Sequence, residues 1–177
     1  MLTRDVAFRT RLYAKDANKA KWSDYEVYSA INDAVRVVAQ EDIRAGNGDD
    51  FRTKRVITVT NGRAELPTGF LSEIRAFDSE GVELLNVHSD VPLETEREYS
   101  VRGTYLYAGT SPIELWYFAL PPFVAADSDE LAMRDKWFVP VAKAAAALLM
   151  GQDAGSVSMA RYCTDQAETP AEGGSSK

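Results

Sequence analysis

Cysteine and histidine are almost missing from this sequence of 177 residues, since each occurs once, as Cys163 and His88. A single cysteine excludes an internal disulfide framework and any metal site built from several thiolates. The single histidine precedes Ser89 and Asp90 in a polar stretch. Because a histidine in a polar loop needs no special role, we interpret His88 as a solvated residue and not as a catalytic base.

The sequence also lacks the motifs of nucleotide and metal chemistry. It has no Gly-x-x-x-x-Gly-Lys-Ser/Thr segment, and no Gly-x-Gly-x-x-Gly segment opens a helix after a predicted strand. The acidic clusters at 49–50 and 94–98 do not follow the spacing of a calcium-binding loop, and the cluster at 127–130 complements the dipole of the predicted helix that follows it without any ion. We therefore predict no catalytic, cofactor-binding or metal-binding residues, and we predict that the protein is not an enzyme.

Long apolar runs are absent as well. The most apolar stretch, 137–150, contains Pro140 and Lys143 and is shorter than the roughly 20 apolar residues that a membrane-spanning helix needs. The first residues, Met1 to Asp5, lack the basic head and apolar run of a secretory signal. We expect a chain that is neither exported nor in contact with a membrane.

Acidic side chains outnumber basic ones, and the excess is uneven. The formal net charge is −7. Residues 1–60 hold 11 basic and 9 acidic side chains, a net +2, whereas residues 61–177 hold 9 and 18, a net −9. An acidic surface argues against a protein that coats duplex DNA, because such proteins neutralise phosphates with Lys and Arg.

Three stretches have helical patterns. Residues 3–14 predict a short helix with Thr3 as its N-cap and with Phe8 and Leu12 on one face. Ser23-Asp24-Tyr25-Glu26 is a capping box that predicts a helix from Asp24 to about Arg44. A third helix is predicted at 133–150, with Pro140 at its start or at a kink. The apolar stripe of the second helix consists of Val27, Ile31, Ala34, Val35 and Val38.

The middle of the chain shows the period of two that is typical of strands. Residues 56–60 and 63–66 flank Asn61-Gly62, which predicts a β-hairpin. Further strands are predicted at 74–77, 82–87, 99–102, 104–107 and 113–120. The last of these is almost continuously apolar, so we place it in the centre of the sheet.

These patterns predict an α+β fold with N-terminal helices, a mostly antiparallel β-sheet, and a C-terminal helix packing on the N-terminal helices. The predicted domain covers residues 1–151, with helices in 1–46, strands in 55–122 and a helix in 133–150. Residues 152–177 are predicted to form a partly disordered extension that includes a short helix at 156–166.

Several segments, in this order, resemble the head-tail adaptor (connector) proteins of tailed phages. The resemblance covers residues 9 to 150 and rests on the joint order of the segments. They are Arg9-Thr10-Arg11-Leu12-Tyr13, Trp22-Ser23-Asp24-Tyr25-Glu26-Val27, Ile31-Asn32-Asp33-Ala34, Leu66-Pro67 with Phe70-Leu71-Ser72-Glu73-Ile74, the strand from Tyr105 to Pro121, and the closing helix after Asp129 and Trp137.

The resemblance implies a structural subunit of the virion neck, assembled in the host cytoplasm. Such a subunit forms a homo-oligomeric ring, expected to be a dodecamer, which docks on the portal protein, receives the tail or neck protein and lets DNA pass as cargo. No cofactor is implied. Within the extension we expect Met159, Arg161 and Tyr162 to contact the portal, the alternative being a chain end with no role.

Two other functions stay open at this point. A soluble non-viral binding module could use an aromatic sheet face formed by Tyr99, Tyr105, Tyr107, Trp116, Tyr117 and Phe118. An enzyme with a site shared between subunits would need several acidic residues to converge with His88. Core packing and subunit contacts are the favoured interpretation of the aromatic residues.

Overall fold

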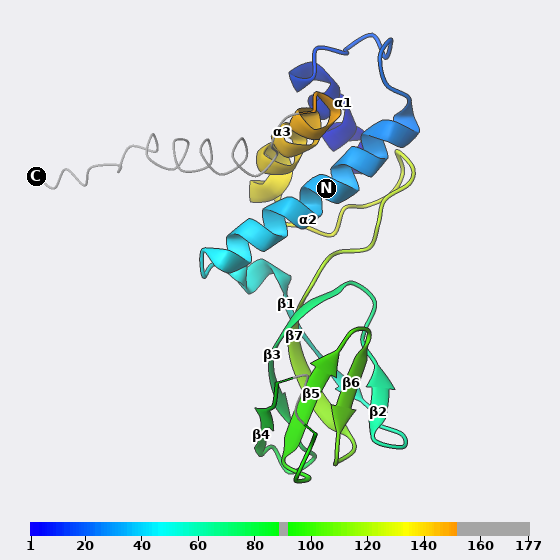
Figure 1. Cartoon of the computed structure of the whole chain (residues 1–177). Helices are drawn as coiled ribbons and strands as arrows, with labels where there is room; N and C mark the ends of the chain where they lie inside the picture. Colours follow the sequence, from blue (N-terminus) through cyan, green and yellow to red (C-terminus); the bar gives the residue numbers. More distant parts are fainter. Residues whose placement is uncertain (89–91, 152–177) are drawn as a thin grey trace, which may run out of the picture. The chain divides into compact units, whose positions relative to one another are not determined.

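The computed structural model describes residues 1–88 and 92–151, which form two compact units (Figure 1). The helical unit contains residues 1–47 and the described chain from Pro122 onward, and the sheet unit contains residues 48–121. Helices and strands are segregated between the units, so the fold class is α+β, as predicted. None of the helices in the described ranges is both long and apolar enough to cross a membrane.

Three helices build the helical unit: α1 (Thr3–Tyr13), α2 (Asp24–Arg44) and α3 (Phe138–Leu149). Helix α3 packs against both α1 and α2, which confirms the predicted packing of the C-terminal helix on the N-terminal helices. The short side chains of α3 allow this close approach. Ala144, Ala145, Ala146 and Ala147 are all at most 1% exposed.

Helix α2 follows the sequence signals closely. The Ser23 hydroxyl accepts a hydrogen bond from the Glu26 backbone N–H, and the Glu26 carboxylate accepts one from the Ser23 backbone N–H at 2.7 Å. This hydrogen bond from Ser23 lowers the pKa of Glu26. Gly46 ends the helix with a φ of +80°, a conformation that favours glycine. All five residues of the predicted apolar stripe are buried.

The other two helices differ from their predicted starts. Thr3 is not an N-cap: it is the first residue of α1, and its hydroxyl donates to the Asp129 carbonyl at 2.9 Å. Helix α3 begins at Phe138 and not at Met133, because residues 135–137 form a 3₁₀ turn. Pro140 lies in the first turn of α3, where its missing N–H has no helical partner to lose.

Helix α2 also holds the segment that follows Pro122. The Asn32 side-chain amide donates to the Val124 carbonyl at 2.8 Å and accepts from the Val124 N–H at 3.0 Å. One turn earlier, the Tyr28 hydroxyl donates to Asp127 at 2.8 Å. Burial and this contact with a carboxylate raise the pKa of Tyr28 to about 12. The two side chains attach an irregular segment to a regular helix.

Seven strands curl into one sheet in the order β1-β7-β3-β4-β5-β6-β2 (Figure 1). All described pairings are antiparallel except β4 with β5. Strand β7, which was predicted to be central, lies inside the sheet between β1 and β3, one strand away from the edge. The strands are β1 (Arg52–Ile57), β2 (Arg63–Glu65), β3 (Phe70–Phe77), β4 (Glu83–Asn86), β5 (Glu98–Arg102), β6 (Tyr105–Ala108) and β7 (Ile113–Ala119).

The predicted hairpin around Asn61-Gly62 is wrong beyond its turn. Asn61 and Gly62 have φ values of +53° and +76°, and Thr60 bridges Arg63 across them. Beyond this bridge the two strands separate: β1 pairs with β7 over six residues, and β2 pairs with β6. Strand β1 can pair over six residues with the apolar β7, whereas β2 has only three residues to offer. Strands β1 and β2 therefore separate as the sheet curls.

The inner side of the curled sheet forms one apolar core. It contains residues from six strands, and Ile113, Leu115 and Leu106 are fully buried within it. Tyr99 also lies in this core, where burial raises its pKa to about 12. Because side chains alternate along a strand, the residues between these core positions point to the other side of the sheet.

Candidate interaction surfaces

The side of β1, β7 and β3 that faces away from the core carries a continuous group of aromatic and charged side chains. We call it the outer sheet face. The pairing between strands determines which side chains lie side by side on this face. Lys54 on β1 and Arg75 on β3 both lie opposite Trp116 on β7, and the residues two positions further along each strand lie side by side in the same way. It consists of Arg52, Lys54, Val56, Arg75, Phe77, Glu114, Trp116 and Phe118.

Trp116 is at the centre of this face, with a cation on each side. The Lys54 ammonium lies 5.2 Å from the ring centroid, and the Arg75 guanidinium carbon lies 5.8 Å from it. Both distances are within the range of cation–π attraction. The Phe77 ring meets Trp116 edge-on at a centroid distance of 6.4 Å. These contacts fix Trp116 and place two positive charges beside an apolar surface.

Glu114 balances part of that charge. Its carboxylate accepts from Trp116 Nε1 at 2.7 Å and pairs with Lys54 Nζ at 3.1 Å. The hydrogen bond from Trp116, together with Lys54, lowers the pKa of Glu114. The carboxylate is therefore charged and engaged at neutral pH.

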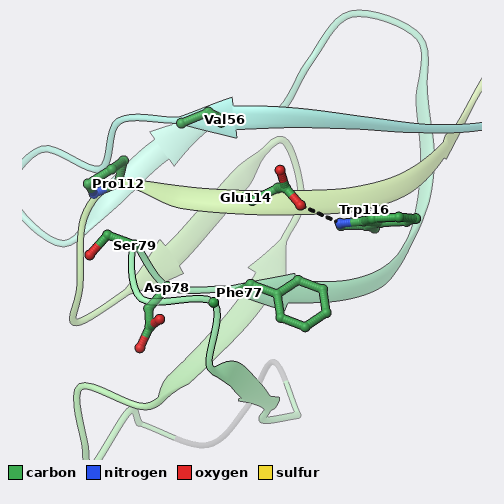
Figure 2. A pocket seen from close by; sticks show the side chains of 8 residues that line it. Val56, Phe77, Asp78, Ser79, Pro112, Glu114 and Trp116 are labelled. Carbon is green, nitrogen blue, oxygen red and sulfur yellow. Dashed lines mark hydrogen bonds between the residues drawn. The ribbon is translucent and has the colours of Figure 1, made fainter.

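A cavity of about 530 Å³ opens on this face (Figure 2). Val56, Phe77, Pro112 and Trp116 give it apolar walls, and the Val56 side chain is 62% exposed. Figure 2 shows Glu114 directed toward Trp116, with the hydrogen bond that joins them.

The other carboxylate of the cavity is engaged too. Asp78 accepts the backbone N–H groups of Glu80 and Val82, each at 2.9 Å, and so holds the turn after β3. Both acids of the cavity are thus engaged in contacts within the sheet unit. Among the described residues, no three His, Cys, Asp or Glu side chains gather as a metal-binding cluster.

The helical unit exposes apolar side chains as well. Phe8 and Leu12 do share one face of α1, but that face points outward, with exposures of 61% and 42%. The buried face of α1 instead uses Val6, Ala7 and Thr10. Phe8 and Leu12 therefore form a small exposed apolar pair on the helical unit.

The loop between α1 and α2 is organised around Arg11, which is 3% exposed. Its guanidinium donates to Asp16 at 2.7 Å, to the Trp22 carbonyl at 2.9 Å and to Asp24 at 2.8 Å. The sequence carried no signal for this arrangement, because a helical arginine is usually a surface residue.

Asp16 completes the network from the loop side. Its carboxylate accepts backbone N–H groups from Ala20, Lys21 and Trp22. Burial alone would raise the pKa of Asp16, but these three hydrogen bonds and the nearby Arg11 charge lower it. The network fixes the path of the chain into the capping box of α2.

The residues predicted to contact the portal, Met159, Arg161 and Tyr162, lie outside the described residues, as does the helix predicted at 156–166. His88 is exposed. The aromatic residues proposed as one sheet face do not share it, because Tyr99 and Tyr117 point into the core, away from Trp116.

A family model described as SU10 adaptor protein matches residues 2–169. The chain belongs to this family of phage head-tail adaptors. The match extends over both compact units, and the predicted resemblance to head-tail adaptors is confirmed. No curated protein matches the sequence.

As a phage adaptor, the protein is a structural component of the virion and interacts with other components of the head or tail. This class of protein is not an enzyme class. The exposed apolar and charged surfaces of the adaptor are therefore candidates for protein contacts.

Proposed function

We propose that this adaptor forms a closed ring, dodecameric by expectation, which docks on the portal protein and joins it to the tail or neck protein. The observation that carries the proposal is the family match over residues 2–169. In a ring with cyclic symmetry, each subunit meets its two neighbours through two different surfaces. The outer sheet face and the exposed face of α1 give each subunit more than one surface for such contacts.

DNA passes through the proposed ring as cargo. The net charge of −9 over residues 61–177 supports this role, since an acidic lining repels the phosphate backbone and keeps the duplex from binding as it passes. The ring would assemble on the portal in the host cytoplasm and remain in the neck of the virion.

Residues 152–177 are proposed to be an extension of the adaptor body, and Met159, Arg161 and Tyr162 are its proposed portal contacts. Deleting residues 152–177 tests this assignment separately from ring formation. The deletion variant should attach to portal rings less than the full chain does. Equal attachment would contradict the proposed contact.

Electron microscopy of purified portal rings mixed with the adaptor tests the main proposal. We expect a second ring stacked on the portal, and this ring should have the same rotational symmetry in every class of particle images. Portal rings alone are the control. Portal particles without added density, in the presence of adaptor that is folded by circular dichroism, would contradict the proposal.

A further inference from the structure

Strand β1 presents a basic edge of the sheet. It is the first strand in the sheet order and pairs with β7 along one side, so the backbone groups on its other side face outward. Five of its six residues are exposed. Three of these five are basic: Arg52, Lys54 and Arg55.

Other contacts leave this edge positive. Lys54 pairs with Glu114 at 3.1 Å, and Arg52 pairs with Asp49 at 2.9 Å. These two carboxylates offset two of the three positive charges of β1, and the exposed Arg55 keeps the edge positive. The sheet unit as a whole has the opposite sign, with 7 basic and 12 acidic side chains. The β1 edge is thus a basic region on an acidic unit.

The loop that leads into β5 presents the opposite charge in a fixed position. Glu98 accepts the backbone N–H groups of Glu94 at 2.6 Å and Thr95 at 3.2 Å, and the bond from Glu94 lowers the pKa of Glu98. Gly109 lets the loop approach closely, because a Cβ there would lie 2.9 Å from the Glu96 Cα. The backbone is held while Glu94 and Glu96 stay exposed.

The basic edge and the acidic loop lie at separate places on the sheet unit. Three strands, β7, β3 and β4, stand between β1 and β5 in the sheet order. One subunit can therefore offer its basic edge to one neighbour and its acidic loop to the other, which is the arrangement that a closed ring requires. The opposite edge is less suited, because β2 has only three residues and Arg63 already bonds to Thr60 on that side.

We infer that, in the ring, the basic edge of β1 (Arg52, Lys54, Arg55) binds the acidic loop (Glu94, Glu96) of the adjacent copy of this chain. This inference rests on the proposed ring. Opposite charges bring the two surfaces together and select the register, because placing like charges there is unfavourable. The exposed Val56 and the partly buried Trp116, which lie beside the basic edge, add apolar surface to the contact.

Two charge-reversed variants test the contact. R52E/R55E makes the edge acidic and leaves Lys54 on Trp116, and E94K/E96K makes the loop basic. Each variant alone should reduce the fraction of portal particles that carry a second ring by about tenfold or more, because every subunit contact would then join like charges. The matched control is R63E, a charge reversal on the opposite edge strand, which should form rings as the wild type does.

Mixing the two variants in equal amounts should restore rings. In an alternating ring, the acidic edge of one variant meets the basic loop of the other, and the remaining contacts are between unchanged surfaces. The circular dichroism spectrum of each variant verifies its folding. Restoration by mixing excludes misfolding as the cause of the single-variant defects.

Three results would overturn the inference. If the wild type forms rings and R52E/R55E or E94K/E96K forms them equally well, the contact is wrong and the proposed function stands. The same conclusion follows if both variants are folded and fail alone but mixing restores nothing. If the wild type itself forms no ring on the portal, the proposed ring is wrong and the inference fails with it.

Discussion

Replacing Asn32 by Asp removes one hydrogen-bond donor from the helical unit while keeping the shape of the side chain. In the native protein, Asn32 Nδ2 donates to the Val124 carbonyl at 2.8 Å and Asn32 Oδ1 accepts from the Val124 N–H at 3.0 Å. The new carboxylate at neutral pH keeps the second bond and loses the first. It also places a charged oxygen against the Val124 carbonyl oxygen.

The expected loss of stability follows from the burial of Val124, which is 3% exposed. A hydrogen bond contributes about 0.5–1.5 kcal/mol net, and a buried polar group left without a partner costs about 1–3 kcal/mol. We expect Asn32→Asp to lower the free energy of unfolding of the helical unit by about 1–3 kcal/mol. Asp33 is exposed on the same helix, so Asp33→Asn makes the reverse chemical exchange as a matched control and should change stability by less than about 0.5 kcal/mol.

Urea unfolding followed by far-ultraviolet circular dichroism measures both variants, because the helices give most of that signal. A lower midpoint with an unchanged slope indicates a loss of stability in the folded state. If Asn32→Asp unfolds at the same urea concentration as Asp33→Asn and the wild type, the amide of Asn32 does not hold the segment after Pro122 and the reasoning is refuted.

Two further predictions concern Glu26 and Gly69. The folded-state pKa of Glu26 is lowered by the hydrogen bond from Ser23, so its contribution to stability is present above the ordinary carboxyl pKa and is lost as the pH falls through the folded-state value. The stability difference between wild type and Glu26→Gln, measured by urea unfolding across a pH series, should therefore be largest near neutral pH and shrink under acid; a constant difference would contradict this cause. Gly69→Ala should destabilise the sheet unit more than Gly81→Ala: both glycines have φ near +80°, but a Cβ at Gly69 would lie 2.7 Å from the Leu120 carbonyl oxygen, whereas nothing lies within 4 Å at Gly81. Equal melting temperatures for the two variants would show that the segment around Leu120 moves away easily.

The helix α2 and the strand β7 were predicted well because their signals are local. The capping box at Ser23 and the apolar stripe through Ile31 specify a helix without any distant contact. The apolar run in 113–120 predicts a strand inside the sheet, and β7 is bordered by β1 and β3. The family resemblance was also visible in the sequence, since it depends on the order of such segments.

Predictions that depended on distant partners were less accurate. The Asn61-Gly62 turn formed, but the strands beside it found partners elsewhere, because a turn specifies two or three residues and not the register that follows. The outward direction of Phe8 could not be read from its spacing with Leu12, since a shared helix face can be either the core or the surface face.

The sequence by itself therefore determined the kinds of element, their order along the chain and the family, because capping, periodicity and apolar runs act over short stretches. Only the tertiary structure decided that Arg11 is buried, that Asn32 holds Val124, and that Trp116 lies between Lys54 and Arg75 on the outer sheet face. Each of these contacts joins residues from different elements, and their geometry exists only once the chain has brought those elements together.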